Sequence, residues 1–382
     1  MWLRNLKVVL PDGVIRGASL HIEGDRIADI VLGRQGGVDC GGLTAIPGLV
    51  DLHSDTLERE LVPRPGVELP TELALLELDK RLVSNGITTA YVTVSLGLGP
   101  DLSTQEKGLR ILEAIEGMRD YLLSEVRVHV RLEITANRDV VEWVVEAIQT
   151  GRVHLVSLMD HSPGQGQFRD LESFVRYYQR WLGVGSEEAY SLAEDRMRKA
   201  ASPQTWELAQ RVARAALEKG IPLASHDDDK EEKVALVHNL GASISEFPVS
   251  LAAAELAKRL GMQVVMGSPN VLLGRSHVGN LSALEALQKG VLDGLVSDYH
   301  PSSLIQSSLR LSREGLMPLS RAVKLVAENP ARMAGLMDRG RITKGSLADV
   351  VLVEEGEYPR VRATLRRGRF VYWDGSFCGI LP

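Results

Sequence analysis

Short apolar runs alternate with longer amphipathic segments through the middle of the chain. Eight of these runs have the length of β-strands, and they cover residues 48–52, 87–94, 126–134, 153–159, 221–225, 242–247, 263–266 and 294–297. Predicted helices lie between or after them, including Ser202-Pro203 to Gly220, 250–261 and 320–329. Strands that alternate with helices predict a parallel sheet, and eight units predict an α/β fold of the (β/α)8 TIM-barrel type. An open doubly wound sheet is the alternative.

Both ends of the chain show a different pattern, with short strands separated by turns. At the start, Leu6–Leu10 is followed by the turn Pro11-Asp12-Gly13, and similar strand-length runs occur near the end at 349–353 and 368–372. We therefore predict a small β-sandwich domain formed by residues 1–46 and 342–382, and a barrel domain of residues 47–341.

One connection in the predicted barrel is longer than the others. Between Met159 and Ile221 the sequence adds a helical insertion at about 167–200, which is rich in charged and aromatic residues. An insertion after a barrel strand lies over the C-terminal face, where active sites form. Two interpretations stay open: a lid over the active site, or a packing element.

Composition excludes some functions. The formal net charge of −6 argues against a general nucleic-acid binder, which would carry a basic stripe. No run of eighteen apolar residues and no secretory leader occur, so we expect no membrane span. Cys40 and Cys378 lie in opposite terminal segments, which favours a reducing, cytoplasmic location. A homodimer is compatible with the sequence, although nothing in it demonstrates one.

Side chains that bind metals recur where the predicted strands end. They are His53 and Asp55 at the first strand, Glu133 at the third, Asp160 and His161 at the fourth, His226 at the fifth and Asp298 at the eighth. Alternate residues of a strand point to one face, so His53 and Asp55 can bind one ion together. Mixed imidazole and carboxylate ligands suit Zn²⁺, Mn²⁺ or Fe²⁺, and two ions fit if Glu133 bridges them. The histidines assigned to structural roles are His21, His129, His154 and His238.

Such a site predicts hydrolysis. A bound divalent ion lowers the pKa of water from about 15.7 toward about 7, and a carboxylate beside it can accept a proton and pass it on. Asp298 is the predicted catalytic base, because it ends the last strand and can face the metal from the opposite wall. Alternatively, Asp298 acts only as a metal ligand, or as a partner for a histidine.

A glycine-rich loop after the seventh strand is the predicted anion site. It covers residues 267–280 and precedes a helix that starts near Leu281. Helix N-termini attract anions, and barrels often bind phosphate in this region. The predicted substrate-binding residues are Ser268, Asn270, Arg275, Ser276 and His277, with Arg64 from the loop after the first strand and Asp160 beside His161. An ordinary glycine-rich loop is the alternative.

Several stretches resemble known proteins. Residues 46–53 and 340–351 resemble the entry to the catalytic barrel of the amidohydrolase superfamily and its return to a small β domain. More specific stretches are His53-Ser54-Asp55 with 63–67, then 157–165, 224–228 and 266–270 with Gly274 and Ser276-His277. Together they resemble the PhnM family of the carbon–phosphorus lyase pathway, and the likeness extends to about Tyr372.

This resemblance implies a substrate and a set of site residues. It implies metal-dependent hydrolysis of α-D-ribose 1-methylphosphonate 5-triphosphate, a small anionic phosphorylated ribose, to the 5-phosphate and diphosphate. The implied metal-site residues are His53, Asp55, Glu133, His161, His226 and Asp298. The superfamily usually has His-x-His at the first strand, and here Asp55 replaces the second histidine. Its frequent bridging carboxylated lysine is absent from the strand ends considered, and Glu133 is the expected substitute.

Two other functions stay open at this level. A hydrolase of C–N bonds, such as a deacetylase or cyclic amidase, would need the same metal site but no triphosphate pocket. A non-catalytic scaffold that has kept the barrel would bind no metal.

Overall fold

Eight parallel strands form the centre of the molecule. The computed structural model describes residues 1–382 except 65, 98–102, 167, 169, 277–278 and 377–382. The barrel strands are β6 (Leu49–Ser54), β7 (Ile87–Leu96), β8 (Glu125–Glu133), β9 (Leu155–Met159), β10 (Leu223–His226), β11 (Ile244–Glu246), β12 (Gln263–Gly267) and β13 (Gly294–Val296). They pair in sequence order, and a parallel bridge between Ser54 and Asp298 joins the last strand to the first. The expected (β/α)8 barrel is therefore confirmed.

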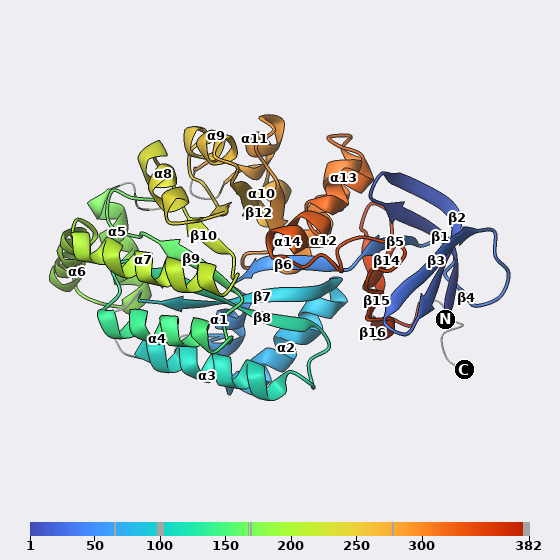
Figure 1. The fold of residues 1–382 in the computed structure, drawn as a ribbon, viewed down its shortest axis with the longest axis horizontal. Coiled ribbons are helices and arrows are strands. Elements are labelled where there is room, and N and C mark those ends of the chain that lie inside the picture. Colours follow the sequence, from blue (N-terminus) through green and yellow to red (C-terminus); the bar gives the residue numbers. More distant parts are fainter. Residues whose placement is uncertain (65, 98–102, 167, 169, 277–278, 377–382) are drawn as a thin grey trace.

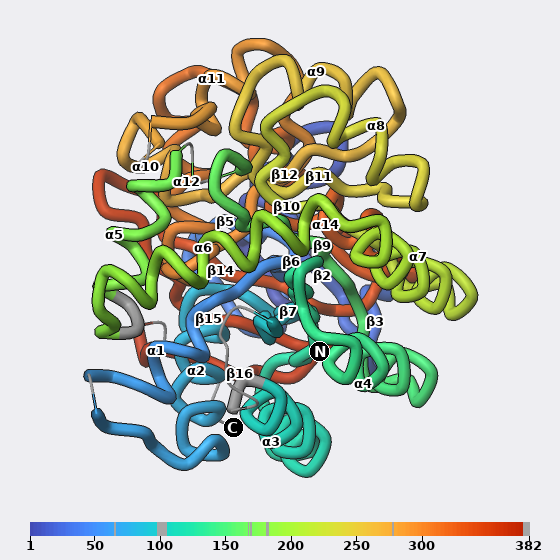
Figure 2. Tube along the Cα trace, turned by 90° about the vertical axis from the view of Figure 1, so that its left-hand side faces the viewer, coloured from blue at the N-terminus to red at the C-terminus, as the bar shows by residue number. Residues whose placement is uncertain are grey.

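Helices surround these strands (Figure 1) and form a ring around them when the molecule is turned by 90° (Figure 2). They are α1 (Thr56–Leu61), α2 (Thr71–Ser84), α3 (Ser103–Met118), α4 (Arg138–Gln149), α5 (Leu171–Leu182), α6 (Ser186–Ala200), α7 (Pro203–Glu218), α8 (Glu231–Asn239), α9 (Leu251–Arg259), α10 (Ser268–Leu273), α11 (Ala283–Gln288), α12 (Ser302–Arg313), α13 (Leu319–Lys324) and α14 (Glu328–Met333). Ser202 precedes α7, which has proline in its first turn, and Gly220 follows it at φ +66°, as its sequence signals predict.

The alternation along β8 explains how the barrel presents polar groups inward. Val128, Val130 and Leu132 are buried in the large core between the strands and the helices. The residues between them point to the other face, because side chains alternate along a strand. A smaller apolar cluster that includes Val50, Leu155 and Val265 fills the interior below the polar rim.

Both ends of the chain join in one mixed sheet of eight strands, at the right of Figure 1. Its strands are β1 (Trp2–Leu10), β2 (Gly13–Glu23), β3 (Arg26–Leu32), β4 (Val38–Asp39), β5 (Thr44–Pro47), β14 (Val350–Glu354), β15 (Arg360–Arg366) and β16 (Arg369–Trp373). The antiparallel pairing of β5 with β14 links the two termini. Leu3, Leu20, Ile342 and Leu352 belong to its separate core. Strands β4, β5 and β15 have no counterpart among the strands expected from the sequence.

Helices α5 and α6 occupy the long connection after β9. Phe168, Phe174, Tyr178 and Ala193 form a small core of their own. The side chain of Asp170 accepts a hydrogen bond from the backbone N–H of Ser173, which caps the start of α5. This pair of helices is thus a packed unit attached to the rim of the barrel.

Two expected elements differ in the structure. Residues 268–273 form helix α10 rather than a loop, and 320–329 is divided between α13 and α14. The break between α13 and α14 has a physical reason: the carbonyl oxygens of Leu325 and Val326 accept hydrogen bonds from Leu295 and Val50 at the starts of β13 and β6. No helix among the described residues is long and apolar enough to cross a membrane.

Candidate metal centre

Imidazole and carboxylate groups gather at the rim where the barrel strands end. The ring centroid of His53 lies 5.5 Å from that of His226, which lies 5.8 Å from that of His161. Three groups place one potential ligand atom per residue within 4.8 Å of the others: His53, Asp55 and Asp298; His161, His226 and Asp227; and His53, His129 and Glu246. Side chains from separate strands therefore converge on one region.

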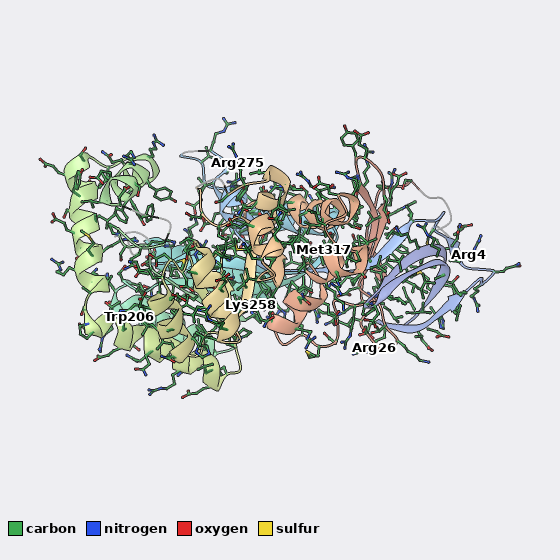
Figure 3. The ribbon with its side chains drawn as sticks, turned by 90° about the horizontal axis from the view of Figure 1, so that it is seen from above. Arg4, Arg26, Trp206, Lys258, Arg275 and Met317 are labelled. Carbon is green, nitrogen blue, oxygen red and sulfur yellow. The ribbon has the colours of Figure 1, made fainter. Side chains whose placement is uncertain are left out.

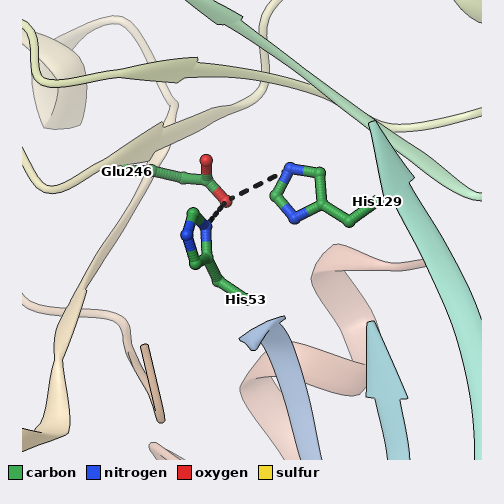
Figure 4. Close-up of side chains that lie close together, drawn as sticks. All are labelled: His53, His129 and Glu246. Atoms are coloured by element: carbon green, nitrogen blue, oxygen red, sulfur yellow. Dashed lines mark hydrogen bonds and ion pairs between the residues drawn. The ribbon is translucent and has the colours of Figure 1, made fainter. Parts of the chain in front are cut away.

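His53 is oriented from both sides of its ring. Its Nε2 lies 3.3 Å from Asp55 Oδ1, so the two side chains share a face as expected, and its Nδ1 lies 3.4 Å from Glu246 Oε1. Figure 4 shows Glu246 between His53 and His129. Burial alone would lower the pKa of His53, but the charges of Asp55 and Glu246 outweigh it and raise the pKa.

Glu246 is held in turn by a buried chain of hydrogen bonds. Ser157 Oγ–H donates to Glu246 Oε2 at 2.6 Å, and Ser157 Oγ lies 2.5 Å from His129 Nε2. The opposite ring nitrogen, His129 Nδ1, donates to the carbonyl oxygen of Leu52 at 2.9 Å. Both nitrogens of His129 are thus engaged within the protein, which agrees with a structural role for this histidine.

Glu133 and His161 form a second buried pair. Glu133 Oε2 lies 2.9 Å from His161 Nδ1, and the carboxylate also accepts the backbone N–H of His161. His161 Nε2 is 3.8 Å from Asp227 Oδ2, which is 3.4 Å from His226 Nδ1. Glu133 therefore faces Nδ1 of His161, and Asp227 faces Nε2 of the same ring.

The helical insertion touches this pair. Arg196 from α6 is buried and places a guanidinium nitrogen 3.8 Å from Glu133 Oε2. Phe168, which precedes α5, lies 6.2 Å from His161 between ring centroids. Of the two interpretations of the insertion, these contacts favour a cover over the site.

Negative charge exceeds positive charge at the rim. The carboxylates are Asp55, Glu133, Asp227, Glu246 and Asp298, and the guanidinium groups that contact them are Arg131 and Arg196. Arg131 donates to Asp55 at 2.9 Å and lies 3.1 Å from His226 Nε2. Burial, with the charge of Asp55, raises the pKa of Asp298 to about 6. Buried carboxylates need compensating charge, so this donor set fits divalent cations.

The backbone is strained at three positions on the same rim. Asp227, Phe247 and Asp298 follow strands β10, β11 and β13, and their φ angles are +54°, +52° and +57°. Such angles are unfavourable for residues other than glycine, and they concentrate at functional sites. The chain turns at or near the end of each of these strands, and the ring centroid of Phe247 lies 5.0 Å from that of His53.

The residues expected to bind substrate are more widely distributed. Asp160 is buried and accepts the N–H of Ser162, and buried Ser268 lies 2.6 Å from Ser303 Oγ. Asn270 and Ser276 are half-buried, whereas Arg64 and Arg275 are exposed. In Figure 3 the side chain of Arg275 projects outward from its loop. His277 lies outside the described residues.

Two carboxylates in these donor groups were not expected from the sequence. Glu246 ends the sixth barrel strand, and Asp227 directly follows His226. The rule that found the other candidates, a carboxylate at a strand end, would also have found Glu246. No pattern in the sequence shows that Asp227 turns back between His161 and His226.

Comparison with known proteins identifies the family. The amidohydrolase family model matches residues 44–377. The chain belongs to the amidohydrolase family. This amidohydrolase is 36% identical to the α-D-ribose 1-methylphosphonate 5-triphosphate diphosphatase of Escherichia coli (strain K12), over 97% of this chain and 100% of that protein.

Solved structures share the fold at low identity. N-acetylglucosamine-6-phosphate deacetylase from Pasteurella multocida has a TM-score of 0.67 and 13% identity, covering 97% of this chain and 98% of that one. The 5-methylcytosine deaminase from Klebsiella pneumoniae has a TM-score of 0.65 and 14% identity, covering 98% of each chain. These likenesses establish the amidohydrolase fold and no particular substrate.

Proposed function

We propose that this amidohydrolase splits α-D-ribose 1-methylphosphonate 5-triphosphate into the 5-phosphate and diphosphate, in phosphonate catabolism. The 36% identity to the Escherichia coli diphosphatase, across the full length of that relative, carries the proposal. The C–N hydrolase alternative has weaker support. Solved structures of such enzymes share the fold at 13–14% identity, and an adenine deaminase and a dihydroorotase match only 36% and 24% of this chain. A cytoplasmic location and a homodimer stay predictions of the sequence.

We propose two divalent cations, zinc, manganese or iron. His53, Asp55 and Asp298 would hold one, and His161, His226 and Asp227 the other, because each set offers three atoms within 4.8 Å. In this assignment Glu246 and Glu133 orient His53 and His161 through their Nδ1 atoms, as carboxylates commonly do for metal-binding histidines. A bridging role for Glu133, implied by the family resemblance, stays a prediction.

The proposed reaction breaks the bond between the phosphorus nearest the ribose and the terminal diphosphate. A divalent cation in such a site makes bound water more acidic and polarises a phosphoryl oxygen. Asp298 takes the proton from the attacking water and passes it to the leaving diphosphate. Its position supports this role, because its carboxylate belongs to the same donor group as His53 and Asp55 and would lie beside water bound there.

Arginines at the rim would bind the triphosphate. Arg131 lies among the donor groups, where it donates to Asp55 and contacts His226, and its positive charge would attract the phosphoryl oxygens. The remaining predicted substrate contacts are Arg64, Asp160, Ser268, Asn270, Arg275, Ser276 and His277. The packed insertion would exclude bulk water from the bound triphosphate, which strengthens these electrostatic contacts.

The test follows both products by phosphorus NMR. Metal-loaded protein is mixed with the ribose 5-triphosphate, and we expect equal amounts of diphosphate and 5-phosphate to form. N-acetylglucosamine 6-phosphate serves as the C–N control substrate, with acetate release as its readout. Acetate release without diphosphate release would replace the proposed function with the C–N alternative.

A further inference from the structure

A basic groove lies at the end of the barrel opposite the metal centre. It has a volume of about 1020 Å³. Its walls are formed by the start of β8, by His154 just before β9, and by the turn between β15 and β16. Strand β8 runs from Glu125 in this groove to Glu133 at the metal centre, a distance of about 26 Å for an extended strand. The groove is thus separate from the proposed active site.

Arginines dominate the lining of the groove. They are Arg119, Arg127, Arg366, Arg367 and Arg369, against the carboxylates Asp25, Asp120 and Glu125. Glu125 pairs with two of these arginines, Arg127 at 2.6 Å and Arg367 at 3.8 Å, and with Arg339 at 2.7 Å. In a chain of net charge −6, this is a local excess of positive charge.

Two arginines of the groove form no direct ion pair among the described residues, and the charges of Glu125 and Asp349 act on one of them, Arg366, from a longer distance. Arg366 is half-buried and donates to the backbone carbonyl oxygen of Leu123 at 3.2 Å, and burial lowers its pKa. Arg369 is exposed and forms no ion pair with the part of the chain that the structure describes. Burial and the charges of Arg127 and Arg119 lower the pKa of neighbouring His154 to about 4, which is a further sign of a positive field.

The walls of the groove are held in place. A Cβ atom on Gly368, which has φ +75°, would lie 2.6 Å from the carbonyl oxygen of Gly24. The turn after β15 therefore packs closely against the turn after β2, and both turns line the groove. Strand β15 also contacts β7, so the terminal sheet is fixed against this end of the barrel.

We propose that this groove is a second binding site, for a small anion that carries a diphosphate or triphosphate group. Guanidinium groups form paired hydrogen bonds with phosphoryl oxygens, and five arginines from separate segments line this groove. The volume is at the upper end for small-molecule sites, which suits a polyphosphate better than a single carboxylate. The site does not depend on the proposed function, because it is remote from the metal centre.

Calorimetry with inorganic diphosphate tests the proposal on the metal-loaded protein. The double variant Arg119→Gln/Arg369→Gln removes charge from the groove, and Arg16→Gln/Arg321→Gln removes the same charge from exposed positions elsewhere. We expect the wild type and the control to bind diphosphate at the groove in addition to the metal centre. The groove variant should lose one diphosphate site, or bind diphosphate at the groove at least tenfold more weakly.

A second readout places the ligand. The ring resonances of His154, assigned with His154→Gln, should shift when diphosphate is added to the wild type and stay fixed in the groove variant. Equal site numbers and affinities in the groove variant and the control would overturn the proposal. The proposal would also fail if the groove variant altered only the oligomeric state and left diphosphate binding unchanged. In that case the arginines would form an interface between copies of the chain.

Discussion

The two ends of strand β8 lie in regions of opposite charge. At its carboxyl end, Glu133 belongs to a rim where buried carboxylates outnumber the guanidinium groups beside them. At its amino end, Glu125 is paired with three arginines, and arginines are in excess over carboxylates. One barrel thus presents a cation site on one face and an anion site on the other. Chemistry is expected at the carboxyl end and stability at the amino end, as is usual for such barrels.

Removal of divalent cations should give the largest effect. Chelation followed by gel filtration is expected to abolish diphosphate release and lower the melting temperature by several degrees, because the rim carboxylates would lose their counter-charge. Added Mn²⁺ or Zn²⁺ should restore both properties. Unchanged turnover in protein shown to be metal-free would contradict a catalytic cation site at the carboxyl end of the barrel.

Asp298→Asn should lower kcat by about 10² to 10⁴, the range for loss of a general base. The fold should persist, because the amide keeps the shape of the side chain, and metal analysis will show how much of the cation held with His53 and Asp55 is lost. Steady-state kinetics and metal analysis check this, with Asp12→Asn on an exposed turn as the matched control. A rate near that of the wild type would exclude Asp298 as the base.

Glu246→Gln separates orientation from direct chemistry. Because Glu246 holds His53 in place, its loss is expected to weaken metal affinity by about 10- to 100-fold. Excess metal should then recover most of the turnover, which would not happen if Glu246 acted on the substrate. Metal titration of activity provides the measurement, and Ser157→Ala should show the same effect in weaker form.

Glu125→Gln should affect stability rather than turnover, and its effect is the smallest. Burial would raise the pKa of Glu125, but Arg339 and Arg127 outweigh it and lower the pKa to about 2, from an ordinary 4.5. Its stabilisation is therefore full at neutral pH and is lost as the pH falls below 4.5 and through 2. We expect Glu125→Gln to cost about 2 kcal/mol at pH 7 and less at pH 3, measured by urea unfolding. A cost that does not depend on pH would contradict this.

The sequence by itself determined the barrel and much of its rim. Alternating strands and helices predict eight parallel units, and strand periodicity places His53 and Asp55 on one face. These features depend on local spacing, which the order of residues fixes directly. The family resemblance pointed to the same strand ends.

Only the tertiary structure decided which groups meet across the barrel. Glu246 faces His53 because closure of the barrel brings β11 within three strands of β6, and Asp227 reaches His161 through a strained backbone angle after β10. The division of α13 from α14 has the same origin, since carbonyl groups of the intervening residues pair with the starts of distant strands. Contacts between residues far apart in the chain depend on barrel closure and packing, and no local pattern encodes them.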